Sequence, residues 1–126
     1  MKRFFKSFGY ALAGIRVAFR SEQSLRIHAM AMVIAIAMGL FLEISMTAWG
    51  FVVFAIGFVL TAELFNTGIE RLGDGSSNGK QKLVIKRAKD VSAGAVLVSA
   101  LTALVIGILF LFIPFGQKIA ELIQAP

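Results

Sequence analysis

The uncharged run at residues 44–62 limits the possible folds more than any other feature. No Asp, Glu, Lys or Arg occurs between Glu43 and Glu63. A helix needs about 20 apolar residues to cross the roughly 30 Å hydrocarbon core of a bilayer, so this run is long enough to do so. Hydrophobic residues make up 58% of the chain and the mean hydropathy is +0.83, whereas soluble domains are about 45–50% apolar. The sequence therefore predicts an integral membrane protein.

Two further apolar stretches flank this run. We expect an all-α fold in which three helices cross the membrane, at about residues 27–47, 48–70 and 91–113. A very short turn at 43–47 would join the first two spans as an antiparallel hairpin. Pro114, with Gly116 close behind, is expected to end the third span, because proline interrupts a helix.

The N-terminal residues 2–20 show a different, amphipathic pattern. Apolar side chains recur there at three- and four-residue steps, and basic residues fill much of the remainder: Phe4, Phe5, Phe8, Leu12, Ile15 and Phe19, against Lys2, Arg3, Lys6, Arg16 and Arg20. This pattern is typical of a helix that lies in the membrane surface. With 126 residues, the chain has room for one domain, 1–126, built from a surface helix and three spans.

The basic residues predict the orientation in the membrane. The chain has 13 Lys and Arg residues. One group precedes the first span and another lies between the second and third spans: Lys2, Arg3, Lys6, Arg16, Arg20 and Arg26, then Arg71, Lys80, Lys82, Lys86, Arg87 and Lys89. By the positive-inside rule, the N-terminus and residues 71–90 face the cytoplasm. The net charge of +6 is explained by attraction to anionic lipid headgroups, so no nucleic acid partner is expected.

Residues 60–74 carry polar groups out of the long uncharged run. At about 100° per residue, Glu63, Asn66, Glu70 and Asp74 share one helix face that is roughly 80° wide. A carboxylate at the inner margin of a membrane helix is costly unless it is paired, hydrated or bound to a cation, so Glu63 is a functional-site candidate. The alternative is a helix end that enters water with ordinary surface acids.

The remaining residue types favour phosphate chemistry at this face. One His and no Cys exclude the common zinc and thiol sites. Mg²⁺ takes oxygen ligands, usually one or two carboxylates with phosphate oxygens. Lys89 and Asp90, just before the third span, could add a cation for phosphate and an acid, although charges at a helix start also have purely structural roles. His28 is expected to be an interfacial polar residue rather than a catalytic base.

Small residues on the third span favour close helix packing between subunits. A stripe of them runs along one side of it: Ser92, Ala95, Ser99, Thr102 and Ala103. Small side chains let helices approach closely in lipid. Three helices alone make a thin bundle with few places to bury polar groups, so we expect a homo-oligomer.

Two segments resemble the signature of the bacterial diacylglycerol kinase and undecaprenol kinase family. Residues 63–70 read Glu-Leu-Phe-Asn-Thr-Gly-Ile-Glu, and residues 88–96 read Ala-Lys-Asp-Val-Ser-Ala-Gly-Ala-Val. The resemblance covers about residues 3–113. It implies a homotrimer in the bacterial inner membrane, with active sites shared between neighbouring subunits, that transfers the γ-phosphate of ATP to a membrane lipid alcohol.

The resemblance also implies roles for individual residues. Glu63 would be the general base on the lipid hydroxyl, and Glu22 and Glu70 would hold the Mg²⁺ that carries ATP. The expected nucleotide-binding residues are Tyr10, Arg16, Asn66, Lys89 and Asp90. The role of Asp74 is left open, as are the number of metal ions and the subunit that completes each site.

The choice of lipid rests on one position. The diacylglycerol kinases tend to have an acid where His28 stands, and the undecaprenol kinases often have histidine there. The preferred substrate is therefore undecaprenol, with diacylglycerol as the alternative. A family serine near the start of the third span is Ala93 here, and the 75–87 loop is longer and more basic than in the diacylglycerol branch. The remaining alternative is a membrane assembly protein without catalysis.

Overall fold

The computed structural model describes residues 2–75 and 81–124, and these residues are almost entirely helical. No strand occurs among them. The elements in chain order are α1 (Lys2–Ser21), α2 (Gln23–Phe41), α3 (Met46–Asp74), α4 (Gln81–Gly107), the π-helical segment η1 (Ile108–Phe112) and α5 (Ile113–Gln124).

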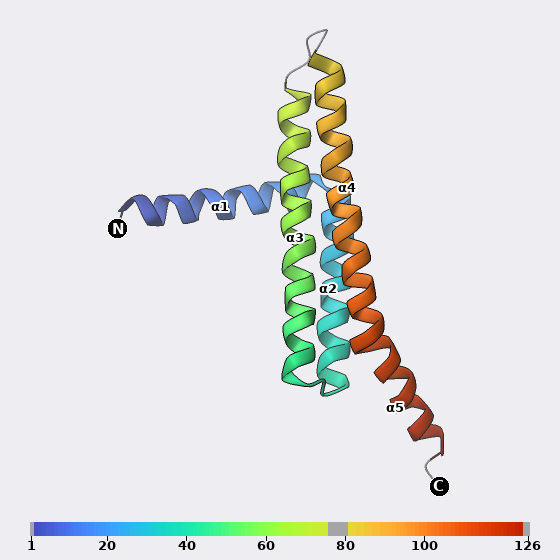
Figure 1. The fold of residues 1–126 in the computed structure, drawn as a ribbon. Helices are drawn as coiled ribbons and strands as arrows, with labels where there is room; N and C mark the ends of the chain where they lie inside the picture. Colours follow the sequence, from blue (N-terminus) through green and yellow to red (C-terminus); the bar gives the residue numbers. More distant parts are fainter. Residues whose placement is uncertain (1, 76–80, 125–126) are drawn as a thin grey trace.

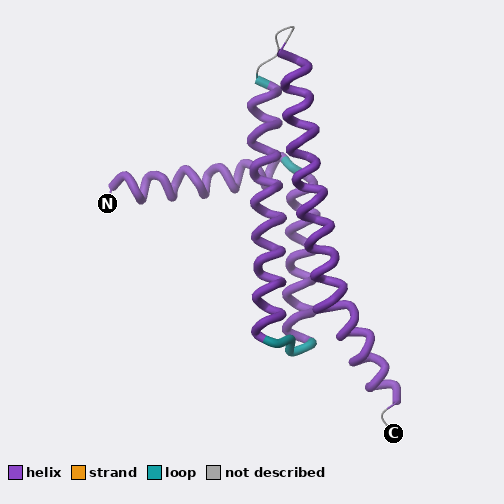
Figure 2. The backbone as a smooth tube through the Cα atoms, viewed as in Figure 1, coloured by secondary structure: helices purple, strands orange, loops and turns teal. Residues whose placement is uncertain are grey.

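Helices α2, α3 and α4 pack side by side, and α3 contacts both of the others (Figures 1 and 2). The structure has three helices that are long and apolar enough to cross a membrane, and they contain α2, α3 and α4. The buried face of α3 carries small and β-branched residues at helical spacing, namely Ala48, Val52, Ala55 and Val59. The predicted all-α class with three membrane-crossing helices is thus confirmed.

The connection between α2 and α3 is as short as expected and covers residues 42–45. Glu43 has a φ of 52°, a left-handed conformation that costs energy for a residue with a Cβ atom. Ser45 starts α3, because its Oγ accepts a hydrogen bond of 3.2 Å from the Ala48 amide. A Cβ atom at Gly39 would lie 2.9 Å from the Trp49 ring, so glycine lets the two helices close against each other here.

Helix α3 is longer than the span 48–70 that the sequence predicted. Its 29 residues correspond to about 44 Å, more than the roughly 30 Å of hydrocarbon. The upper part of α3 and the start of α4 project beyond the level at which α1 meets α2 (Figure 1). The turn between α3 and α4 is also shorter than the 75–87 loop of the sequence analysis, because α4 already begins at Gln81. Residues 76–80 of that turn lie outside the described residues.

The prediction that Pro114 ends the third span is wrong. The chain widens into the π-helical segment η1 and then continues as α5 through Pro114. Proline is tolerated in the first turn of a helix, where its missing N–H has no partner to lose, so a new helix can start here at an angle. Figure 1 shows α5 turning away from the bundle. Lys118 connects α5 to the end of α2, because its Nζ donates a hydrogen bond of 2.8 Å to the Phe41 carbonyl oxygen.

Helix α1 lies crosswise to the bundle (Figure 1). Its junction with α2 is fixed by Arg26, whose guanidinium donates to the carbonyl oxygens of Phe19 and Arg20 at 3.4 and 3.1 Å. These are free carbonyl groups at the end of a helix, where a cation is stabilising. Ala18 and Leu25 are buried beside the junction. Much of the apolar side of α1, including Phe8 and Leu12, stays exposed.

Candidate active site

Glu63 is the most deeply buried ionisable side chain of the described residues, with 1% of its surface exposed. It lies on α3 and faces the first two turns of α2. Ser24 Oγ donates a hydrogen bond of 3.0 Å to Glu63 Oε2. His28 Nε2 lies 3.1 Å from the other oxygen, Oε1. A buried carboxylate needs such partners, because an isolated charge inside a protein is very costly.

The Oε1 atom of Glu63 is nevertheless not satisfied. His28 Nε2 is close enough for an ion pair but makes no hydrogen bond to it, so Oε1 is buried with no hydrogen-bond donor among the described residues. Thr67 Oγ1, one turn further along α3, is also buried without a hydrogen-bond partner there. Two buried oxygens without donors are unusual in a folded protein. Glu63 Oε1 is therefore free to accept a hydrogen bond from a bound hydroxyl group.

A second group of polar side chains joins α3 to α4. Asn66 Nδ2 donates to Glu70 Oε1 at 3.2 Å, and Ser92 Oγ donates to Asn66 Oδ1 at 2.7 Å. The amide of Asn66 is thereby held at both ends. Glu70 keeps a second carboxylate oxygen, Oε2, that no described side chain contacts by a hydrogen bond or ion pair. This arrangement can offer a carboxylate to a cation.

One turn beyond Glu70, Asp74 pairs with Lys89 across the same two helices. Lys89 Nζ lies 2.7 Å from Asp74 Oδ1. The helices come very close here, because a Cβ atom at Gly73 would lie 2.8 Å from the Ile85 side chain. The predicted acid face on α3 thus has two neighbours: Glu63 faces α2, whereas Asn66 and Asp74 face α4.

The other predicted site residues lie apart from these contacts within one chain. Glu22 joins α1 to α2 and accepts a hydrogen bond of 2.9 Å from Ser21. Asp90 is exposed at the start of the apolar part of α4. Tyr10 and Arg16 lie on α1, and in the described part of the chain neither makes a hydrogen bond or ion pair with the acid face. Tyr10 is 75% exposed.

The acids do not form a metal centre by themselves. Among the described residues, no group of three His, Cys, Asp or Glu side chains is placed to hold a metal ion. The donor set nevertheless fits Mg²⁺ bound together with phosphates, since such an ion needs only one or two carboxylates from the protein. The uncontacted Oε2 atom of Glu70 meets that need.

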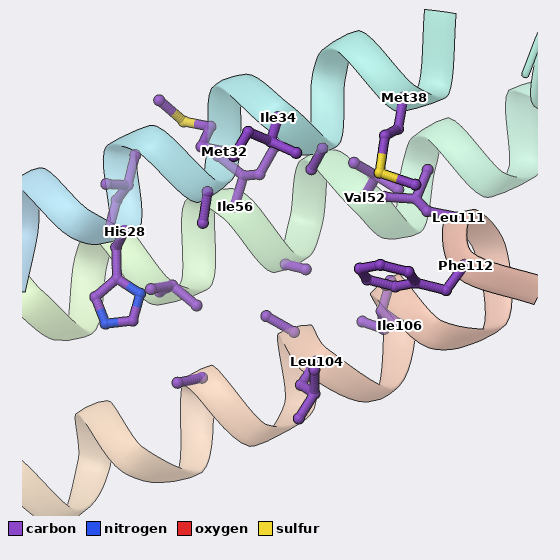
Figure 3. A pocket seen from close by; sticks show the side chains of 18 residues that line it. His28, Met32, Ile34, Met38, Val52, Ile56, Leu104, Ile106, Leu111 and Phe112 are labelled. Atoms are coloured by element: carbon purple, nitrogen blue, oxygen red, sulfur yellow. The ribbon is translucent and has the colours of Figure 1, made fainter. Parts of the chain in front are cut away.

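An apolar cavity of about 400 Å³ lies between α2, α3, α4 and η1. Figure 3 shows His28 at one end of it, and Met38, Leu111 and Phe112 at the other. Alanines from α2, α3 and α4 line the cavity, and their short side chains leave the space between the helices unfilled: Ala31, Ala35, Ala55, Ala100 and Ala103. Apart from His28, every lining residue is apolar. The cavity can take a long hydrocarbon chain whose polar end lies beside His28.

The structure also adds residues that the sequence did not indicate. Ser24 holds Glu63, and Ser92 holds Asn66. Hydroxyl side chains are too common for either to stand out in a single sequence. His28 was expected at the membrane surface as a polar residue without a catalytic role, but it lies against Glu63. The apolar cavity has no sequence signal, because its residues match those of any membrane helix.

These features define a class: a multi-pass helical membrane protein in which a buried carboxylate lies beside the histidine that lines one end of an apolar cavity, with a polar face one turn away. The chain matches the family described as prokaryotic diacylglycerol kinase over residues 9–111, and it belongs to that family. Membership confirms the predicted kind of enzyme, a lipid kinase.

Three relatives carry two different names. Undecaprenol kinase of Bacillus subtilis (strain 168) is 38% identical over 114 residues, which are 90% of this chain and 91% of that protein. Diacylglycerol kinase of Synechocystis sp. is 34% identical over 101 residues, 80% of this chain but only 58% of that protein. Diacylglycerol kinase of Escherichia coli (strain K12) is 26% identical over 114 residues, 90% of this chain and 93% of that protein.

Proposed function

We propose that this protein transfers the γ-phosphate of ATP to the hydroxyl group of a membrane lipid, with undecaprenol as the preferred acceptor. One observation carries the proposal: Glu63 Oε1 is buried without a hydrogen-bond donor beside His28, which lines the end of an apolar cavity. A lipid with its tail in the cavity has its hydroxyl group next to the free carboxylate oxygen. That is the position of a general base.

In the proposed reaction, Glu63 acts on the lipid, whereas the second polar group, which contains Asn66 and Glu70, acts on the nucleotide and its metal ion. Glu63 Oε1 takes the hydroxyl proton as the lipid oxygen bonds to the γ-phosphorus atom and the bond between that phosphorus and the β,γ-bridging oxygen breaks, which releases ADP. Glu70 and Glu22 would hold the Mg²⁺ that neutralises phosphate charge when bound. Asn66, Lys89 and Asp90 orient the nucleotide, and Tyr10 and Arg16 complete its pocket.

The proposed assembly is a homotrimer in the bacterial inner membrane. Within the described part of one chain, Tyr10 and Arg16 make no hydrogen bond or ion pair with the acid face, so a neighbouring subunit has to bring them to it. The positive-inside rule puts the N-terminus in the cytoplasm. The projecting ends of α3 and α4 then reach the compartment that contains ATP, and α1, which crosses the bundle at the level of Ser24, lies in the membrane surface.

Two observations favour undecaprenol over diacylglycerol. The relative named undecaprenol kinase is 38% identical to this chain, whereas the two relatives named diacylglycerol kinase are 34% and 26% identical over no larger part of it. His28, rather than an acid, stands beside Glu63. Diacylglycerol remains the alternative, because both lipids present a primary hydroxyl group on a long apolar tail.

The test uses purified protein, labelled ATP and Mg²⁺ with each lipid in turn. We expect labelled undecaprenyl phosphate to form with the higher kcat/KM. A higher kcat/KM for diacylglycerol would reverse the choice of lipid, and no labelled product from either lipid would contradict the proposed function.

The cavity gives a separate prediction about lipid binding. Replacing Ala103 by Phe fills part of the cavity from α4, so the lipid tail loses room. We expect the KM for the lipid to rise by about 10-fold or more, since losing a few buried methylene groups costs about 0.8 kcal/mol each. The KM for ATP should not change, because the nucleotide residues lie beyond the end of the cavity.

Val105→Phe is the matched control for this substitution. Val105 lies two residues further along α4, is exposed, and does not line the cavity. The same increase in lipid KM from both substitutions would show that the cavity does not hold the tail.

A further inference from the structure

The surroundings of Glu63 raise the question of where its proton goes after it has acted as a base. The carboxylate is only 1% exposed, and its two oxygens face Ser24 and His28. A proton on Glu63 Oε1 has no direct path to water through this chain. It has to leave before the next lipid can react, because a protonated carboxyl group cannot act as a base again.

His28 offers that path. Its Nε2 atom is 3.1 Å from Oε1, the oxygen that has no other polar neighbour, and its side chain is 27% exposed. Imidazole is the side chain that takes up and releases a proton between about pH 5 and pH 8. Ser24 cannot replace it, because its Oγ already donates to Oε2 and a hydroxyl group does not hold a second proton near neutral pH.

We propose that His28 is a proton relay for Glu63. The inference rests on the proposed function. The lipid hydroxyl proton moves to Glu63 Oε1 as the new O–P bond forms and ADP leaves. It then moves to His28 Nε2, which becomes an imidazolium, and from there to water, so both side chains return to their starting state. His28 therefore acts through Glu63 as a positioning residue and carries the proton away from it.

The charges around His28 are consistent with this role. Glu63 on α3 is the titratable group that faces it, and the other residues of the cavity from α2, α3, α4 and η1 are uncharged. Arg26 on α2 is occupied by the carbonyl oxygens of Phe19 and Arg20. Among these residues, Glu63 is therefore the one titratable neighbour that contributes to a pH effect assigned to His28, and it is already part of the relay.

The test compares His28→Gln with wild type in the full-length protein. Glutamine keeps a polar group of similar reach but cannot carry a proton. With saturating lipid and Mg-ATP, wild-type kcat should fall as the pH is lowered, because an imidazole that already carries a proton on Nε2 cannot accept another there. His28→Gln should lower kcat by about 100-fold, the low end for a positioned proton-transfer group. It should also abolish this dependence on pH.

Ser24→Ala is the comparison that separates relay from support. It removes a hydrogen bond to the same carboxylate, so kcat should fall while the pH profile keeps its wild-type shape. A His28→Gln enzyme with a wild-type pH profile would overturn the relay and leave only a structural contact. Wild-type enzyme that phosphorylates neither undecaprenol nor diacylglycerol would instead contradict the proposed function.

Discussion

Replacing Glu63 by Gln is expected to remove nearly all lipid phosphorylation without unfolding the protein. The amide cannot accept the hydroxyl proton, and a positioned general base contributes about 10²- to 10⁴-fold to a rate. The fold should persist because glutamine has the same size, and its carbonyl oxygen can still accept from Ser24 Oγ, which now donates to Glu63 Oε2 at 3.0 Å. The measurement is kcat with undecaprenol, alongside thermal unfolding of the purified protein.

Glu121→Gln is the matched control for the charge. Glu121 is an exposed acid on α5, outside the residues 9–111 that match the family. It loses the same charge, so its kcat should equal that of wild type. Thermal stability of the Glu63 variant should be equal or higher, because it removes a charge that is costly to bury. Near-normal turnover by this variant would exclude Glu63 as the base.

Most of the helical architecture could be predicted because apolar runs in lipid have few alternatives. Backbone polar groups must be satisfied inside each segment, so a run such as 44–62 has to be a helix. The bend before α5 could not be predicted in the same way. Pro114 was interpreted as a stop, but a proline in the first turn of a helix is equally compatible with a new start. The choice depends on what the following turn can contact, and here Lys118 reaches the end of α2.

The sequence predicted which site residues share one face of α3, but not which neighbouring helix each of them contacts. The spacing of Glu63, Asn66 and Glu70 places them on one face of α3, and the hydrogen bond between Asn66 and Glu70 agrees with that spacing. Periodicity does not say which neighbour each side chain meets. The structure directs Glu63 to α2 and Asn66 to α4. In the proposed function, this division separates the position for lipid chemistry from the position for the nucleotide.

The roles of the nucleotide and metal residues stay predictions. Glu22, Tyr10 and Arg16 lie on or beside α1, away from the contacts between α3 and α4. Their link to the site depends on how subunits meet, and a single sequence contains no direct information on that geometry. In the proposed trimer, the way in which the subunits meet determines whether one site contains all of these residues.

Replacing Glu70 by Gln is expected to weaken the use of Mg-ATP much more than the binding of lipid. The introduced glutamine keeps an oxygen that accepts from Asn66 Nδ2, now 3.2 Å from Glu70 Oε1, so the chain of hydrogen bonds to Ser92 can persist. The substitution removes the charge that a divalent cation needs. We expect the Mg²⁺ concentration for half-maximal activity to rise by at least about 10-fold, the low end for disturbing a metal site.

Asp74→Asn decides whether that effect is specific to Glu70. It removes the same charge one turn further along α3, but its carboxylate contacts Lys89 rather than Asn66. If Glu70 binds the metal, its variant should shift the Mg²⁺ titration far more than Asp74→Asn does, while the KM for undecaprenol stays near wild type. Equal shifts would mean that both acids act only through the local negative potential, because a long-range field does not distinguish neighbouring carboxylates. Direct binding of the metal ion would distinguish them, because only one of the two carboxylates contacts the ion.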